Sequence, residues 1–136
     1  MALTFFKNQS AFSLVEIMIV IAIIGIIASW AIPSYQQSIL TSHRSDAKSG
    51  LLKLQLEQEK WRAAHSAYAI LDELQINTIT ENGYYHLTIE ENPDSDQFFA
   101  VARPMGSQKK DHCGSFAINQ FGAVYEKFAN ARCWGE

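Results

Sequence analysis

The sequence is poor in cysteine, proline, glycine and charge, and these shortages exclude several classes of protein. Of its 136 residues, two are Cys, three are Pro, seven are Gly, and 18% are charged. This composition excludes collagen-like, disordered and coiled-coil chains. The formal net charge is only -3, so the chain as a whole is not a cationic trap for nucleic acid. The length suits one compact domain rather than a multidomain enzyme.

The sequence also lacks the short motifs that carry catalysis. It has no phosphate-cradling glycine loop, no paired-histidine metal helix and no nucleophile elbow. An acidic segment at residues 90–96 concentrates oxygen ligands, but without the regular spacing of calcium loops, so a solvated turn is preferred to a Ca²⁺ site. We therefore expect no enzyme, no metal and no cofactor. The histidines lie without convergent acids and are expected to be solvated surface residues: His43, His65, His86 and His112.

Charge is absent altogether from residues 17–42, and the first half of this segment is almost purely aliphatic. Such a run supplies the ~20 apolar residues that a helix needs to cross a bilayer. A buried core helix is disfavoured, because a domain this small cannot cover an apolar helix of that length on all sides. A cleaved secretory signal is the other alternative, since residues 26–31 offer one loose match to a small-residue cleavage site.

One acidic residue, Glu16, stands directly before this run. An ionised carboxylate in a membrane helix costs roughly 2.5 to 3.5 kcal/mol on insertion scales, so an acid at this place is a functional hypothesis by default. The start of a helix also favours negative charge. The alternative is that Glu16 only reaches the lipid headgroups.

Residues 11–16, Ala-Phe-Ser-Leu-Val-Glu, resemble the N-terminus of a type IV prepilin, as do the aliphatic run, Pro33 and Tyr35 that follow. The resemblance implies a leader at residues 1–11, which a prepilin peptidase removes between Ala11 and Phe12 with N-methylation of Phe12. Ala11 stands where the family usually has Gly, which predicts slower processing.

The same resemblance assigns roles to the apolar helix, residues 12–33, as a transmembrane segment and later as part of the filament core. It implies that Glu16 pairs with the N-terminal amine of the next subunit. Gly25 has low helix propensity and Pro33 removes a backbone hydrogen bond, so the helix between them is expected to bend or melt. The resemblance implies that this loosening lets the helices pack during filament assembly.

Residues 34–68 predict an amphipathic helix. Apolar residues at spacings of three, four and seven form one stripe along it: Ala47, Leu51, Leu54, Trp61 and Tyr68. A narrower stripe beside it contains Leu52, Leu56 and Ala63. Since one face is enough to cover a small sheet, the narrower stripe is a candidate contact with neighbouring subunits. A single wide core face is the alternative.

Period-two alternation after residue 68 predicts four short strands, near residues 85–89, 98–102, 116–118 and 124–128. Turn residues separate these strands, so an antiparallel meander is expected. A long N-terminal helix, half membrane and half amphipathic, packed on this sheet gives an α+β architecture. It is the type IV pilin fold that the N-terminus implies, with residues 69–136 as a periplasmic head.

The head carries both cysteines, Cys113 and Cys133. Because they follow the membrane helix, topology places them in the oxidising periplasm, and one disulfide is the default interpretation. Closing a loop of about twenty residues stabilises a small head by roughly 3 kcal/mol. A reactive thiol or a metal pair with His112 is the alternative, although the metal ligand set is incomplete. The head also resembles the minor pilins of the PilE kind in Gram-negative bacteria, at residues 84–89, 99–104, 113–122 and 133–134.

The leading hypothesis is a minor structural subunit of a type IV pilus. It predicts insertion in the inner membrane with the head in the periplasm, then assembly with major and minor pilins into the extracellular filament by the pilus assembly platform. Adhesion to a surface receptor, twitching motility and DNA uptake are its expected downstream roles. A pseudopilin of a type II secretion machine shares the N-terminal motif, but the pattern of the head favours a pilus subunit.

A second hypothesis is DNA capture for natural transformation. Basic residues gather around the region bounded by the cysteines and are candidates for phosphate contacts: Arg103, Lys109, Lys110, His112 and Arg132. Removing Lys7 and Glu16 from the totals of 11 basic and 14 acidic residues leaves 10 against 13 from Arg44 onward. Only a local patch can therefore act, and a solvated loop is the alternative for Lys109 and Lys110.

Overall fold

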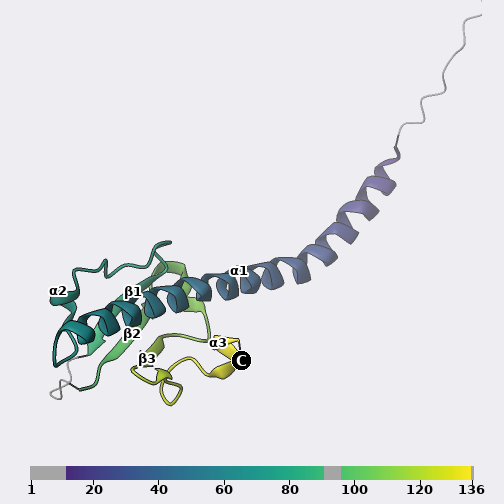
Figure 1. Ribbon diagram of the computed structural model, residues 1–136. Helices are drawn as coiled ribbons and strands as arrows, with labels where there is room; N and C mark the ends of the chain where they lie inside the picture. Colours follow the sequence, from purple (N-terminus) through teal and green to yellow (C-terminus); the bar gives the residue numbers. More distant parts are fainter. Residues whose placement is uncertain (1–11, 91–95, 136) are drawn as a thin grey trace, which may run out of the picture. The chain divides into compact units, whose positions relative to one another are not determined.

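The structure of the chain is a computed structural model, and it describes residues 12–90 and 96–135. The chain divides into two compact units, residues 1–36 and residues 37–136. The described elements, in chain order, are α1 Leu14–Ala64, α2 Leu71–Leu74, β1 Tyr85–Glu90, β2 Phe99–Pro104, the 3₁₀ helix η1 Gly106–Lys110, β3 Phe116–Asn119, β4 Gly122–Ala123 and α3 Ala131–Trp134 (Figure 1).

Helix α1 begins with a cap at Ser13, whose Oγ accepts a hydrogen bond from the backbone N–H of Glu16 at 3.2 Å. A Ser followed three residues later by Glu is the capping-box pattern. Within the described residues, α1 is the helix that is long and apolar enough to cross a membrane, and its apolar part is exposed. The helix continues through Gly25 and Pro33, so loosening between them stays a prediction for the assembled filament.

The later part of α1 covers one face of the sheet (Figure 1). Ala47, Leu51 and Leu54 of the predicted stripe are buried against the strands. Trp61 is half-buried, and Tyr68 packs against the same core from beyond the end of α1 at Ala64, four residues before the predicted end of the helix. Leu52 and Leu56 are 56% and 54% exposed. A single wide core face is therefore wrong, and subunit contact at the second stripe stays a prediction. The strand residues packed in the same core are Tyr85, Leu87, Ala100, Ala102, Phe116 and Ile118.

The sheet is an antiparallel meander in the order β1-β2-β3-β4. The predicted α+β class is confirmed, but the predicted fourth strand at residues 124–128 is wrong. Strand β4 is instead the two-residue segment Gly122–Ala123, and residues 126–128 form a bend. The backbone N–H of Val124 still donates to the Ala117 carbonyl of β3 at 2.9 Å. Beyond it, the half-buried Phe128 packs on Phe99 of β2, with ring centroids 5.5 Å apart.

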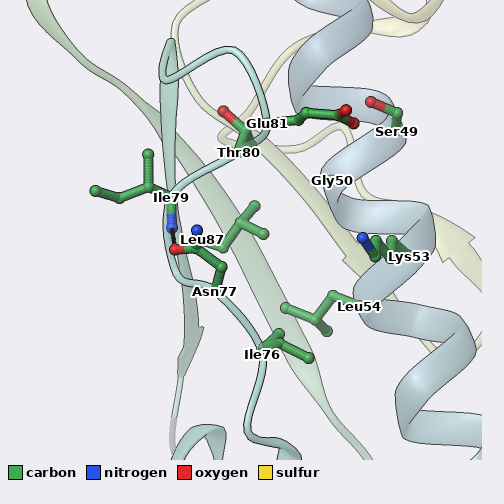
Figure 2. A pocket seen from close by; sticks show the side chains of 10 residues that line it. All are labelled: Ser49, Gly50, Lys53, Leu54, Ile76, Asn77, Ile79, Thr80, Glu81 and Leu87. Atoms are coloured by element: carbon green, nitrogen blue, oxygen red, sulfur yellow. Dashed lines mark hydrogen bonds between the residues drawn. The ribbon is translucent and has the colours of Figure 1, made fainter.

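The segment before β1 packs against α1 at Gly50, where the Thr80 side chain lies close to the helix. A Cβ atom added to Gly50 would lie 2.7 Å from Cγ2 of Thr80. Figure 2 shows the cavity of about 400 Å³ beside this contact, with Leu54 and Ile76 on its apolar wall. Glycine at this point of α1 therefore sets how closely the segment can pack.

A buried carboxylate fixes the turn that leads into β1. Asp46 on α1 is only 3% exposed. Its oxygens accept hydrogen bonds from the Thr80 hydroxyl, from the backbone and side-chain N–H groups of Asn82, and from the backbone N–H of Tyr84. Together these bonds fasten the turn to α1 and set where the first strand starts.

Candidate functional site

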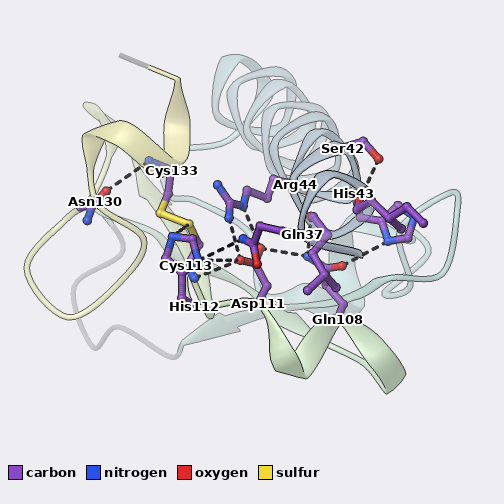
Figure 3. Close-up of polar contacts among 12 residues, drawn as sticks. Gln37, Ser42, His43, Arg44, Gln108, Asp111, His112, Cys113, Asn130 and Cys133 are labelled. Carbon is purple, nitrogen blue, oxygen red and sulfur yellow. Dashed lines mark hydrogen bonds and ion pairs between the residues drawn. A yellow bond between two sulfur atoms is a disulfide. The ribbon is translucent and has the colours of Figure 1, made fainter. Parts of the chain in front are cut away.

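Four of the predicted phosphate-contacting residues lie around the disulfide of the head. Lys109 and Lys110 end η1, and Arg132 lies on α3; all three side chains and that of His112 are exposed. A disulfide joins Cys113 to Cys133, with their Cα atoms 5.9 Å apart, and so holds α3 beside the segment that follows η1 (Figure 3). We call these four residues, Lys109, Lys110, His112 and Arg132, the basic surface.

Arg103, the fifth predicted residue, is not in this group. It lies on β2 opposite His86, on the face of the sheet away from α1, and its guanidinium donates to Glu90 at 3.1 Å. A cation already paired with a neighbouring carboxylate is a weaker candidate for a phosphate contact.

Helix α3, which carries Arg132, is held at both ends. The Asn130 side chain caps it by accepting a hydrogen bond from the backbone N–H of Cys133 at 3.1 Å. At the other end, Lys48 of α1 donates through Nζ to the backbone carbonyl of Trp134 at 3.1 Å. Arg132 is thus presented from a helix that is fixed to α1 as well as to the disulfide.

The other side of the basic surface rests on a buried ion pair between Arg44 of α1 and Asp111. Nε and Nη2 of Arg44 donate to the two carboxylate oxygens of Asp111 at 2.8 and 2.7 Å (Figure 3). Both residues are buried. The backbone N–H of Cys113 adds a third donor at 3.2 Å. Paired, two-point geometry of this kind is the strongest form of an arginine–carboxylate contact.

This environment shifts the pKa of Asp111 below its ordinary value. Burial by itself raises the pKa of the carboxyl, but the hydrogen bonds from Arg44 and from the N–H of Cys113 outweigh that effect. The Asp111 hydrogen bond in turn raises the pKa of Arg44. The pair therefore stays ionised at neutral pH, and its charges cancel each other inside the head instead of adding to the surface.

Gln108, in the middle of η1, is fully buried. Its Nε2 donates to the Leu40 carbonyl at 3.0 Å, to the Tyr85 hydroxyl at 2.9 Å and to Asp111 at 3.0 Å. Its Oε1 lies 3.2 Å from Nδ1 of His43. The side chain before Lys109 is therefore locked between α1 and β1.

His43 differs from its predicted solvated position. Its ring is half-buried and stacks on Tyr84, with ring centroids 3.6 Å apart, in addition to its contact with Gln108. The stacking explains the difference, because an imidazole that covers an aromatic ring removes apolar surface from water. His112, by contrast, is exposed, and its Nδ1 lies 3.4 Å from Nε2 of Gln37.

The structure gives no support for a metal at the cysteines. The ligand atoms of His112, Cys113 and Cys133 lie within 4.8 Å of one another. However, the two sulfur atoms are bonded to each other, so His112 alone of these three offers an unmodified ligand atom. One imidazole does not hold a structural metal ion.

Sequence reasoning missed the buried polar residues that support the basic surface. Arg44 and Lys48 are four residues apart on α1 and therefore share a face, and this spacing was an available signal. Nothing in the sequence marked Gln108 as buried. The proximity of Asp111 to two lysines suggested a solvated loop rather than an internal ion pair.

The N-terminal processing site lies partly outside the described residues. Ala11 belongs to the residues that are not described, so cleavage before Phe12 stays a prediction. Phe12 is exposed, and so is Glu16 in the first turn of α1. No residue of this region is part of the basic surface.

Two sequence families match the chain. Residues 33–117 match the family described as type IV minor pilin ComP, DNA uptake sequence receptor. Residues 6–32 match the prokaryotic N-terminal methylation motif. The first match covers more than half of the chain, and the second covers most of the apolar run and the six residues before Phe12.

Individual relatives are fimbrial proteins and pilins. Fimbrial protein EcpC of Eikenella corrodens is 36% identical over 84 residues, which cover 57% of this chain and 50% of that protein. A type IV major pilin, PilE1, of Neisseria gonorrhoeae is 40% identical over 60 residues, covering 39% of this chain and 36% of that protein. This chain thus spans half or less of these two relatives.

A solved type IV pilin from Shewanella oneidensis has the same fold. It superposes with a TM-score of 0.52 at 20% identity, covering 66% of this chain and 96% of that chain. At this identity the similarity supports the pilin fold and nothing about the ligand.

Proposed function

Since this chain belongs to the type IV minor pilin family named for ComP, a DNA uptake sequence receptor, we propose that its head binds duplex DNA during uptake through the basic surface. From the sequence alone, pilus assembly is the leading hypothesis for the function and DNA capture is the second. The family match supports DNA capture more directly, because the matched residues 33–117 include η1 and its two lysines.

The chain is a type IV pilin subunit, and pilins are structural proteins rather than enzymes. The methylation motif and the apolar helix are consistent with a membrane-anchored prepilin. The finer steps are part of the proposal. They are cleavage after Ala11 by prepilin peptidase, methylation of Phe12, residence in the inner membrane, and assembly with other pilins through a contact at Glu16.

The observation that carries the DNA proposal is the grouping of exposed cations from two separate elements. Lys109 and Lys110 come from η1 and Arg132 comes from α3, and the disulfide joins α3 to Cys113, three residues after the end of η1. Arg132 suits a two-point phosphate contact, whereas each lysine acts as a point charge. A phosphate backbone presents charges at regular spacing, so cations fixed on two elements can contact more than one phosphate.

The size of the basic surface sets the expected salt dependence. Each phosphate contact steepens the fall of log affinity with log salt by about 0.9 for duplex DNA. Three contacts, from Lys109, Lys110 and Arg132, give a slope of about -2.7. Removal of both lysines should make the slope shallower by about 1.8. Between 50 and 200 mM salt, the variant should therefore lose about tenfold less affinity than wild-type protein does.

The test compares two double variants of the full chain in detergent micelles. Lys109→Ala/Lys110→Ala removes both lysines of η1. Lys53→Ala/Lys60→Ala is the matched control, because it removes two exposed lysines of α1 and changes the net charge equally. Fluorescence anisotropy with a labelled duplex measures the affinity at several salt concentrations.

The proposal expects weaker binding and a shallower salt slope for the η1 variant, and a near wild-type result for the control. Equal affinity of wild-type protein and the η1 variant at low salt contradicts the proposal. An equal loss in both variants also contradicts it, since that result indicates a response to net charge and not a localised surface.

A role in filament assembly is the second candidate function. It rests on Leu52 and Leu56, two large apolar side chains that α1 leaves more than half exposed beside the core stripe. Substituting both with Gln should reduce the amount of this subunit in sheared pili without lowering the stability of the head. Unchanged incorporation contradicts a subunit contact at this stripe.

A further inference from the structure

We infer that Gln108 is a positioning residue for DNA binding: it fixes η1 to α1 and β1, so that Lys109 and Lys110 are presented from a rigid turn. The inference rests on the proposed function, because it concerns the same basic surface. It assigns a functional consequence to a buried side chain that does not contact the solvent.

The hydrogen bonds of Gln108 reach three separate parts of the head. Nε2 donates to the Leu40 carbonyl of α1 and to the Tyr85 hydroxyl of β1, and Oε1 contacts His43 of α1. Nε2 also donates to Asp111, the residue that closes η1. An amide with no exposed surface and polar contacts at both ends can occupy one orientation only.

Helix η1 cannot hold its own conformation. It is five residues long. The backbone N–H of Gln108 donates to the Met105 carbonyl and that of Asp111 donates to the Gln108 carbonyl, each at 3.0 Å. Short 3₁₀ segments have poor hydrogen-bond geometry and depend on their surroundings. The side chain of Gln108 supplies those surroundings, since it is the buried residue of η1.

A rigid turn affects binding through entropy. Ordering a loop and its lysine side chains on contact with DNA lowers affinity by the free energy needed to fix them. When the backbone of Lys109 and Lys110 is already fixed by the preceding side chain, binding has to order only the side chains. Loss of the Gln108 contacts should therefore weaken binding while leaving both positive charges in place.

The head offers a matched control for this effect. Gln58 is also fully buried, and its amide makes two hydrogen bonds to the backbone of Ala69, at 2.8 and 2.9 Å. It lies on α1, and both of these hydrogen bonds go to Ala69 rather than to η1. Gln58→Met therefore removes a buried amide in the same way as Gln108→Met, and lowers stability without touching the lysines.

The experiment uses the full chain in detergent micelles and a labelled duplex at 50 mM salt, well below the unfolding temperature of every variant. It measures the affinity of wild-type protein, Gln108→Met, Gln58→Met, Lys109→Ala/Lys110→Ala, and the combination of Gln108→Met with the lysine variant. Amide hydrogen exchange of residues 106–111 is measured on the same proteins without DNA. Gln108→Asn, which keeps the amide but shortens its reach, replaces Gln108→Met should the latter fail to fold.

The inference expects Gln108→Met to weaken binding by a smaller factor than the lysine variant, because both charges remain, and the combined variant to bind no more weakly than the lysine variant alone. Non-additivity of this kind indicates that two changes act through one contact. Exchange in residues 106–111 should accelerate in Gln108→Met and remain as in wild type in Gln58→Met.

Other outcomes separate the inference from the proposed function. If the lysine variant weakens binding and Gln108→Met does not, the inference is wrong and the proposed function stands. If Gln58→Met and Gln108→Met weaken binding equally, the effect is one of general stability and the inference is wrong. If the lysine variant binds DNA as wild type does, the proposed function fails, and the inference with it.

Discussion

The ion pair between Arg44 and Asp111 offers a direct test of how the head is held together. Replacing Arg44 with Leu leaves the Asp111 carboxylate buried, with three remaining contacts in the described part of the chain: the N–H of Cys113, the amide of Gln108, and the exposed His112 ring, whose Nδ1 lies 3.5 Å from Oδ1. Removing one partner of a buried pair costs about 3 to 5 kcal/mol, because the other charge stays without compensation. We expect Arg44→Leu to lower the free energy of unfolding by that amount at pH 7.

A surface pair in the same head provides the control. Arg103 and Glu90 also form an ion pair, but their side chains are 49% and 50% exposed. Exposed pairs contribute about 0 to 1 kcal/mol, so Arg103→Leu should change the free energy of unfolding by no more than that. Urea unfolding of the full chain in detergent, with the disulfide intact, measures both variants by tryptophan fluorescence.

The pH dependence gives the prediction a sign. In the wild type the pKa of Asp111 is lowered, so its contribution to stability is present above the ordinary carboxyl pKa, near 3.9, and is lost as pH falls through the lowered value. In Arg44→Leu the main opposing hydrogen bond is gone, burial raises the pKa, and protonation relieves the cost. The deficit of the variant should therefore shrink as the pH falls from 7 to 4.

Two results refute this reasoning. A deficit below 1 kcal/mol at pH 7 contradicts the burial of an uncompensated charge. A deficit that is constant between pH 7 and pH 4 shows that lost packing, and not the Asp111 charge, accounts for the loss.

Three further predictions concern the fold around the site. Gly50→Ala should lower the urea midpoint, because its new Cβ meets the Thr80 side chain and overpacking costs roughly 1 to 3 kcal/mol. Gly25→Ala should leave the midpoint unchanged, because the space around Gly25 is open. Equal midpoints for the two variants contradict the close packing at Gly50. Replacing Cys113 and Cys133 with Ser should lower the free energy of unfolding by roughly 3 kcal/mol and accelerate amide exchange in α3. Unchanged exchange in α3 shows that this helix is held without the disulfide. Burial raises the pKa of Tyr85 to about 12. Absorbance titrations of wild type and Tyr85→Phe at 295 nm should therefore coincide below about pH 11. A difference between the two curves at lower pH contradicts the burial of Tyr85.

The N-terminal half of the fold was readable from the sequence because its signals are local. The uncharged run and the spacing of Ala47, Leu51 and Leu54 predict a helix and its buried face, and the structure has both in α1. The first three strands follow the period-two pattern. The fourth does not: β4 ends at Ala123, with one further backbone bond from Val124 to the Ala117 carbonyl. Alternation in the sequence cannot distinguish a strand from a segment that leaves the sheet.

The candidate site was only half predictable. Exposed lysines beside a cysteine can be recognised in a sequence, and Lys109, Lys110 and Arg132 were found that way. The residues that orient them are polar and buried, which contradicts the usual partition of polar side chains. Their contacts to α1 connect residues 65 or more positions apart, as between Arg44 and Asp111 or between Gln108 and Leu40, so only the folded chain brings them together.

The head has more acidic than basic residues, but the positions of the acids in the structure leave DNA binding possible at the basic surface. Asp46 and Asp111 are buried and hydrogen-bonded, and Glu90 is paired with Arg103. Each ion pair cancels one charge of either sign, so the net charge of the head is unchanged, and its effect on a bound phosphate depends on how far the remaining acids lie from it. At physiological salt, charges are screened beyond about 8 Å, so a phosphate at the basic surface interacts mainly with the nearest cations. The same screening removes long-range steering, which means that affinity depends on contact geometry. A buried residue that fixes this geometry, as proposed for Gln108, then matters more for binding than it would on a uniformly basic protein.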